Sequence, residues 1–252
     1  ILIPRTRKGD NVILDPDNPQ EEEFALGDKV PTCYYYFWMF PKKMLFYYDR
    51  FIRFSGLSPK LLEHWKQRYL LMIKKALKNT GRERFLSKNP PNTGRIRVLL
   101  EMFPDAKFIF IHRNPVEVFL STRHFFNKMM PNLQLHNIGP AQLEKSIIAV
   151  YKNLMQDYFN QKQMIPEGNL IEIRFDELEQ NPAQIAEIIY DRLHIPGFEE
   201  ARRAFENYMK QTEKYEKNKH RISKSLLDKI TLEWQFMMEK YNYQIPDTID
   251  IE

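Results

Sequence analysis

The 252-residue sequence contains a single cysteine, Cys33, and no long apolar run. One thiol cannot close a disulfide within the chain, so a disulfide-stapled scaffold is excluded and a reducing compartment, the cytoplasm, is expected. A membrane-spanning helix needs roughly eighteen or more consecutive apolar residues, so no transmembrane segment is expected. No group of His, Cys, Asp and Glu has the spacing of metal ligands, and no metal is expected. The G-x-x-x-x-G-K-[ST] loop is also missing, which argues against a P-loop-like kinase.

Positive charge exceeds negative charge, with 38 Lys and Arg against 33 Asp and Glu, a net charge of +5 and a pI near 9.0. Such a surplus favours an anionic partner, whether a nucleotide, a nucleic acid or a membrane surface. The alternative is that these charges are dispersed over the protein surface and serve only its solubility. Hydrophobic residues make up 43% of the chain, as in ordinary globular domains. The 18 Phe and 13 Tyr predict a large aromatic core or an apolar pocket.

Strand and helix patterns alternate through the middle of the chain, which predicts an α/β fold with a parallel sheet flanked by helices. The expected strands cover residues 84–87, 107–111 and 170–175, and the expected helices cover residues 61–79, 96–103, 115 onward and 182–193. The region from 199 to 243 is expected to be mostly helical. Residues 1–252 are therefore interpreted as a single domain with a helical C-terminal region.

Two of the expected parallel strands end in cations, Lys88 and Arg113. Ligands of open α/β sheets bind beyond the carboxyl ends of the strands, so both side chains are expected in one crevice. The helix after Arg113 has Asn114 as its N-cap and Pro115 at its first position, and its positive N-terminus adds to the site. Ser121, eight residues after Arg113, is expected on the face that meets the sheet, with Val118 and Phe125. A guanidinium and a hydroxyl together suit a phosphate clamp, although ordinary strand-end charges and a helix serine would give the same pattern.

At these residues the sequence resembles a known family. The segment 108–121 (FIFIHRNPVEVFLS) is similar to the 3′-phosphate-binding motif of sulfotransferases that use 3′-phosphoadenosine 5′-phosphosulfate (PAPS). Residues 86–95 (LSKNPPNTGR) resemble the Lys-x-Pro turn of the branch that includes tyrosylprotein sulfotransferases and bacterial relatives. Residues 174–178 with Asn181-Pro182 resemble a third family segment, a strand end followed by Asp-Pro. The resemblance extends from about Pro19 to Tyr243.

The resemblance implies a P-loop-kinase-like sulfotransferase fold and assigns roles to several residues. Arg113 and Ser121 would hold the 3′-phosphate of PAPS, with PAP as the product and no metal. Lys88 would stabilise charge on the sulfuryl group in transit, as expected for a transfer that depends on positioning and electrostatics. Lys219, in the segment Lys217-Asn218-Lys219-His220, resembles a basic loop that closes over the donor in relatives, although a solvated charge run explains it equally well.

A catalytic base is sought in the acidic triplet of residues 21–23. Relatives carry a similar acidic segment, and the tyrosylprotein branch uses a Glu in this region, so Glu21 and Glu23 are the favoured candidates ahead of Glu22. The alternative is an acidic first turn that complements a helix dipole. His112 and His124 flank the Arg–Ser motif as further candidates. A His base is not favoured, because Asn89-Pro90-Pro91 stands where cytosolic small-molecule sulfotransferases carry their His.

One family feature has no counterpart in these 252 residues. The Arg-Ser-Gly-Thr-type loop that cradles the 5′-phosphosulfate, with its flanking strand and helix, is not found. We therefore expect the chain to lack this strand–loop–helix, and the sheet to have an uncovered edge and an open groove beside Lys88 and Arg113.

The predicted function is transfer of a sulfuryl group from PAPS to a hydroxyl of a small-molecule or lipid acceptor. The aromatic stretches 34–40 and 46–48 suit a lipophilic alcohol such as a sterol, although buried helix faces would have the same composition. The alternative is a non-catalytic basic module that binds nucleotides or nucleic acid. The absence of helix-turn-helix, zinc-finger and RNP signatures argues against a nucleic-acid partner.

Overall fold

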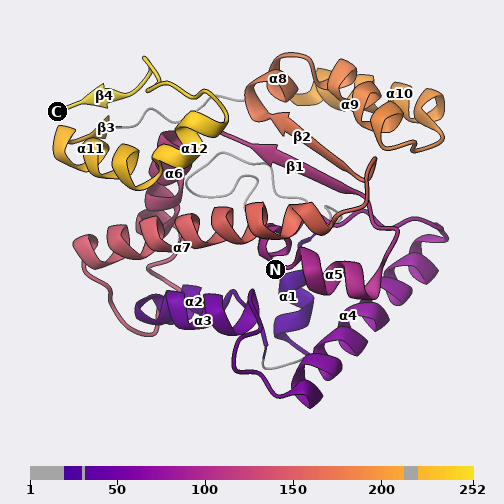
Figure 1. Ribbon diagram of the computed structural model, residues 1–252, viewed down its shortest axis with the longest axis horizontal. Helices are drawn as coiled ribbons and strands as arrows, with labels where there is room; N and C mark the ends of the chain where they lie inside the picture. Colours follow the sequence, from indigo (N-terminus) through magenta and orange to yellow (C-terminus); the bar gives the residue numbers. More distant parts are fainter. Residues whose placement is uncertain (1–19, 30–31, 213–220) are drawn as a thin grey trace.

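The computed structural model describes residues 20–29, 32–212 and 221–252, most of which are helical (Figure 1). The first half contains α1 (Glu22–Gly27), α2 (Tyr36–Met39), α3 (Met44–Phe51), α4 (Pro59–Thr80), α5 (Ile96–Met102), β1 (Phe108–His112) and α6 (Pro115–Lys128), with short 3-10 turns at Pro41–Lys43 and Pro90–Gly94. The second half contains α7 (Pro140–Gln161), a 3-10 turn at Lys162–Met164, β2 (Leu170–Arg174), α8 (Phe175–Gln180), α9 (Pro182–Arg192), α10 (Phe198–Thr212), β3 (Arg221–Ile222), α11 (Lys224–Glu233), α12 (Gln235–Lys240) and β4 (Asp250–Ile251).

β1 and β2 form a parallel pair, in register from Phe108 opposite Leu170 to His112 opposite Arg174. α6 and α7 lie between them in the chain, because parallel neighbours need a long crossover connection. The carboxyl ends of both strands therefore meet at one edge. A second parallel pair, β3 with β4, is only two residues long.

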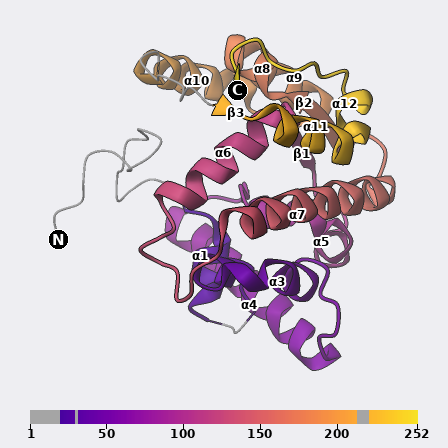
Figure 2. The same ribbon diagram turned by 90° about the vertical axis from the view of Figure 1, so that its left-hand side faces the viewer.

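The long helix α7 runs through the centre of the molecule, with α1 to α5 on one side and the β1–β2 pair, α11 and α12 on the other (Figures 1 and 2). The main hydrophobic core lies along α7, where it packs against α3, α6 and α11. Trp234 is fully buried there and donates its indole N–H to the carbonyl of Ile148 at 3.1 Å. A second core surrounds Trp65 of α4 and anchors α1 and α5.

The start of α6 confirms the capping pattern read from the sequence. The side chain of Asn114 accepts a hydrogen bond from the Val116 N–H at 3.0 Å, and Pro115 occupies the first helical position. α4 is likewise capped by Ser58 and ends at Gly81, whose φ of 65° is unfavourable for side-chain-bearing residues. These local signals place the ends of both helices.

The expected strand at residues 84–87 is not formed. Leu86 in this segment is 83% exposed, and no strand among the described residues pairs with it. A strand exists only where a neighbouring strand completes its hydrogen bonds, so the apolar pattern by itself was insufficient. The described chain is accordingly mostly helical with small parallel sheets, whereas the sequence predicted a broader sheet.

The two faces of β1 are covered to different extents. On one face Phe110 stacks on Tyr158 of α7, with ring centroids 3.9 Å apart. On the other face Ile109 and Ile111 remain 37% and 46% exposed. Within the described residues this face is therefore exposed along β1, whereas Ile173 of β2, opposite Ile111, is buried. None of the described helices combines the length and apolar character needed to cross a membrane.

Candidate functional site

Arg113 directly follows β1 and is held in place by two neighbouring elements. Its Nε lies 3.0 Å from Oε2 of Glu117 in the first turn of α6, and its guanidinium stands 4.7 Å from the ring centroid of Phe175 at the start of α8. The side chain is 32% exposed. The contact with Glu117 uses the Nε–H, and a guanidinium carries further N–H donors that suit a phosphate. Arg113 is thus fixed at the carboxyl edge of the sheet while remaining accessible.

Ser121 lies on the open face of α6, one turn after Glu117. The expectation that Ser121, Val118 and Phe125 meet the sheet is not fulfilled, because Ser121 is exposed. The buried face of α6 is formed instead by large apolar residues, namely Val116, Phe119, Leu120 and Phe126. These residues pack against the core around α7 and α11, which turns the Ser121 face outward on the same side as Glu117.

Lys88 and Glu21, 67 positions apart in the sequence, meet in an ion pair between Nζ and Oε1. The Lys88 side chain is 79% exposed, whereas that of Glu21 is only 19% exposed. The second carboxylate oxygen of Glu21 accepts a hydrogen bond from the hydroxyl of Tyr35. Two residues that the sequence proposed separately for catalysis are therefore in direct contact. Tyr35 was expected only as part of the aromatic stretch 34–40, and its contact with Glu21 was not predicted.

Glu23 occupies a different environment from Glu21. Its carboxylate is fully buried and forms a bidentate pair with Arg95, with oxygen–nitrogen distances of 2.7 and 3.0 Å. It also accepts from the backbone N–H of Tyr34 at 2.6 Å. Glu22 is buried as well and accepts from the hydroxyl of Tyr69 at 3.2 Å. Because these two carboxylates are enclosed and hydrogen-bonded, the geometry favours Glu21 over Glu23 and Glu22 as the base.

His112 is a buried structural residue at the end of β1. Its Nδ1 lies 2.8 Å from the hydroxyl of Tyr243, and this hydroxyl also lies 3.1 Å from the His112 carbonyl. The ring stacks on Tyr241 with centroids 3.8 Å apart. Burial, assisted by the charge of Arg174, lowers the pKa of His112 to about 4. The imidazole is therefore neutral and engaged, which does not suit a general base. His124 is partly buried on α6, and Lys219 lies outside the described residues.

The segment 241–244 covers the carboxyl ends of both strands. Arg174 donates to the carbonyl of Tyr241 at 2.7 Å and stands 4.2 Å from the ring centroid of Tyr243. Asn114 donates its side-chain N–H to the carbonyl of Gln244 at 2.7 Å. These contacts could not be predicted from the sequence, because the residues that they join are about 70 to 130 positions apart.

An aromatic cluster consisting of Phe24, Tyr35, Trp38 and Phe125 joins Glu21 to α6. Tyr35 and Trp38 stack with centroids 4.2 Å apart and planes inclined by 10°. Phe24 lies 5.2 Å from Tyr35, and Phe125 lies 5.6 Å from Trp38. Phe24 is 44% exposed, so the cluster has a face open to solvent. Phe125 lies one helical turn after Ser121 and on the same side of α6. This side of the helix therefore extends from Arg113 at its N-terminal end to the aromatic cluster beside Glu21.

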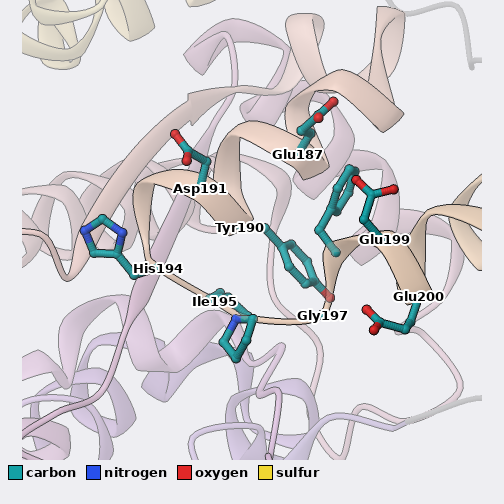
Figure 3. A pocket seen from close by; sticks show the side chains of 10 residues that line it. Glu187, Tyr190, Asp191, His194, Ile195, Gly197, Glu199 and Glu200 are labelled. Carbon is teal, nitrogen blue, oxygen red and sulfur yellow. The ribbon is translucent and has the colours of Figure 1, made fainter.

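A separate cavity of about 530 Å³ lies between α9 and α10 (Figure 3). Its lining contains four carboxylates, those of Glu187, Asp191, Glu199 and Glu200, around Tyr190. Arg202 pairs with Glu187 at 3.4 Å and with Glu199 at 2.8 Å. Within the described part of the chain, none of the residues predicted to bind the donor lines this cavity, so it is not assigned to the donor. Among the described residues no group of His, Cys, Asp and Glu is arranged to hold a metal ion.

The fold is that of a sulfotransferase. The crystal structure of sulfotransferase STF9 from Mycobacterium avium superposes with a TM-score of 0.68 at 16% sequence identity, covering 92% of this chain and 58% of that chain. At this identity the likeness concerns the fold. Residues 12–200 match the sequence model of the Sulfotransferase family, which is most of the chain. The protein therefore belongs to the sulfotransferase family, and the family predicted from the sequence is confirmed.

Two curated relatives support this assignment along the chain. They are the omega-hydroxy-beta-dihydromenaquinone-9 sulfotransferases Stf3 of Mycobacterium bovis and Mycobacterium tuberculosis, each 26% identical over 242 residues. The match includes 96% of this chain but 62% of each relative. The chain thus spans less than two thirds of the length of these relatives.

Proposed function

We propose that this protein transfers a sulfuryl group from PAPS to the hydroxyl of a lipophilic alcohol. The observation that carries the proposal is the contact between Lys88 and Glu21 beside an aromatic wall, in a chain of the sulfotransferase family. A sulfotransferase needs a sulfate donor, a cation for the leaving group and a base for the acceptor. The residues at this site supply the cation and the base within one ion pair.

The donor is assigned to the side of α6 that bears Arg113 and Ser121. Arg113 is pre-oriented by Glu117 and Phe175, which lowers the conformational entropy lost when a phosphate binds. The N-terminus of α6 adds a favourable partial positive charge nearby. Contacts to a 3′-phosphate distinguish PAPS and PAP from adenine nucleotides that lack this phosphate, and this pair of side chains is suited to provide them.

The reaction is assigned to Lys88 and Glu21. The acceptor oxygen forms a bond to sulfur while the bond between sulfur and the bridging oxygen of the 5′-phosphosulfate breaks. The acceptor proton passes to the Glu21 carboxylate, and PAP leaves with the bridging oxygen. Lys88 neutralises the negative charge that grows on this oxygen, a contribution that is largest in the transition state.

The ion pair of the unliganded protein has to be exchanged before this reaction. Lys88 is 79% exposed on a flexible side chain, so an arriving phosphosulfate competes with Glu21 for its ammonium group. Departure of Lys88 leaves Oε1 of Glu21 available to the acceptor hydroxyl. Donor binding would thus place the cation on the leaving group and release the base in one step.

The acceptor is assigned to the aromatic cluster. Phe24 presents an exposed ring beside Glu21, and Tyr35 and Trp38 extend the apolar surface toward α6. Such an aromatic surface favours an acceptor alcohol with a large apolar part, whose hydroxyl reaches the Glu21 carboxylate. The relatives named Stf3 act, by their name, on a hydroxylated dihydromenaquinone, which is lipophilic. A sterol, a quinol lipid or another long-chain alcohol is the acceptor class we infer.

The test is a screen of radiolabelled PAPS against lipophilic alcohols, phenols, glycans and peptides with the full-length protein. Transfer to a lipophilic alcohol is expected, and Lys88→Ala and Glu21→Gln should lower turnover by roughly 10²–10⁴-fold with little loss of PAP affinity. Lys66→Ala is a matched control, because it breaks a surface ion pair with Glu101 away from the site. Label found only in glycans or peptides would overturn the acceptor class. Displacement of PAP by oligonucleotides, without any transfer, would support the non-catalytic module instead.

A further inference from the structure

The ring of Tyr35 is held in a fixed position next to Glu21. It stacks on Trp38 at a centroid distance of 4.2 Å and packs against Phe24 at 5.2 Å. The hydroxyl at its tip donates to Oε2 of Glu21. Burial and the neighbouring Glu21 carboxylate raise the pKa of Tyr35, so the phenol keeps the proton that it donates.

Helix α1 does not itself orient the Glu21 side chain. Glu21 is the N-cap residue of α1 with extended backbone angles, φ −69° and ψ 139°, but its side chain makes no capping hydrogen bond. The carboxylate is instead held from outside the helix, by Lys88 at Oε1 and by Tyr35 at Oε2. Glu22 and Glu23 occupy the acidic first turn of α1, so the charge that complements the helix dipole does not depend on Glu21 alone.

The two partners of Glu21 differ in how firmly they are anchored. Lys88 has an exposed side chain, and under the proposed function it leaves Glu21 for the donor. Tyr35 is fixed by two aromatic contacts and has no comparable freedom. After Lys88 has moved, Tyr35 is the partner that still holds the carboxylate.

We propose that Tyr35 is the positioning residue of the catalytic base, and that its hydroxyl holds Oε2 of Glu21 so that Oε1 faces the acceptor. This inference rests on the proposed function, since it requires Glu21 to act as the base. The aromatic wall thereby has two tasks. It receives the apolar body of the acceptor, and through the Tyr35 hydroxyl it orients the group that takes the acceptor's proton.

The decisive variant is Tyr35→Phe, which removes the hydroxyl and keeps the stacked ring. In the full-length protein kcat should fall about 10- to 100-fold, as expected for loss of a hydrogen bond to a charged group. The KM values for PAPS and for the alcohol should stay within about twofold, because neither binding surface changes. The unfolding temperature and calorimetric PAP affinity should match the wild type, which establishes that the variant is folded.

A double-mutant cycle with Glu21→Gln distinguishes positioning from a general structural effect. If Tyr35 acts through Glu21, adding Tyr35→Phe to Glu21→Gln should lower kcat by less than about twofold more. Tyr158→Phe is the matched control, because the Tyr158 hydroxyl donates to Oε1 of Glu172 at 2.5 Å rather than to Glu21. It should leave kcat at the wild-type value.

Separate outcomes overturn the inference and the proposed function. Wild-type kcat in Tyr35→Phe, together with strong loss in Glu21→Gln, would refute the role of Tyr35 and leave the base assignment intact. Full additivity in the cycle, or a loss that appears in KM alone, would likewise refute positioning. Wild-type kcat in Glu21→Gln would overturn the base assignment itself.

Discussion

Individual side chains at the site are distinguished by their surroundings more than by their type. Glu21, Glu22 and Glu23 are consecutive and chemically identical, yet only Glu21 reaches a partly open position beside a cation. Arg95 and Arg113 likewise carry the same side chain, but Arg95 is fully buried in a core, whereas Arg113 remains 32% exposed. Burial and partners therefore decide which residues are available for chemistry.

The first residue-scale prediction concerns Arg113. Arg113→Ala should weaken PAP binding by one to two orders of magnitude, because a charge-assisted hydrogen bond contributes roughly 1.5–3 kcal/mol. AMP, which lacks the 3′-phosphate, should bind the variant and the wild type with equal affinity. Isothermal titration calorimetry measures both. Lys128→Ala removes a positive charge from the last turn of the same helix and serves as control. Equal wild-type affinity for PAP and AMP would refute the 3′-phosphate assignment.

The second residue-scale prediction concerns His112 and acid stability. Its pKa in the folded protein, about 4, lies below the value near 6.5 in the unfolded chain. Between these values the unfolded chain binds more protons, so His112 contributes stability above pH 6.5 that is lost as the pH falls toward 4. The loss should be on the order of 3 kcal/mol in urea unfolding. His112→Gln should remove that part of the pH dependence, whereas His64→Gln on α4 should retain it. An unchanged pH profile in His112→Gln would contradict the interpretation.

At the scale of elements, the buried Glu23–Arg95 pair joins the N-terminal helices to the main body. Glu23 belongs to α1, and Arg95 immediately precedes α5 and also donates to the carbonyl of Phe51 at the end of α3. One ion pair thus fixes three helices around the base. This arrangement holds α1 rigid, and α1 begins next to Glu21.

Breaking this pair from one side should be costly. Arg95→Leu leaves a buried carboxylate without its partner and should lower the free energy of unfolding by roughly 3–5 kcal/mol. Glu21→Gln breaks an ion pair whose lysine is 79% exposed, and should cost less than about 1 kcal/mol. Urea unfolding of both variants compares the two directly. A similar small cost for Arg95→Leu would show that the buried pair does not anchor α1.

At the scale of the whole molecule, one apolar face of β1 is exposed among the described residues, whereas Ile173 of β2 is buried on the same side. Ile109 and Ile111 of β1 and Leu86 before Lys88 are all exposed. Isolated exposed apolar residues are ordinary, but two neighbours on one strand face, Ile109 and Ile111, favour a surface that another segment covers. We propose that a strand–loop–helix outside these 252 residues covers this face and holds the 5′-phosphosulfate.

This proposal predicts a strong effect of charge on the face of β1. Ile109→Lys should destabilise the full-length protein by roughly 2–4 kcal/mol, because it would bury an unpaired ammonium group under the covering segment. Leu232→Lys on α11, at a side chain 73% exposed, should be tolerated within about 0.5 kcal/mol. Urea denaturation measures both. Equal tolerance of the two lysines would mean that the face of β1 is open to solvent in the full-length protein.

The sequence by itself determined the family, the capping of α6 and the identity of Arg113, Ser121, Lys88 and Glu21 as candidates. These features depend on short spacings and on local backbone preferences, which a linear pattern records. The strand predicted at residues 84–87 is wrong, because a strand requires a neighbouring strand, which a local sequence pattern does not reveal.

Only the tertiary structure separated Glu21 from Glu23 and brought Tyr35 to the Glu21 carboxylate. It also turned Ser121 to the open side of α6 and laid segment 241–244 over the strand ends. Burial, ion-pair partners and ring stacking are properties of residues far apart in the chain. They arise when the core packs, since packing decides which side chains lose their contact with water.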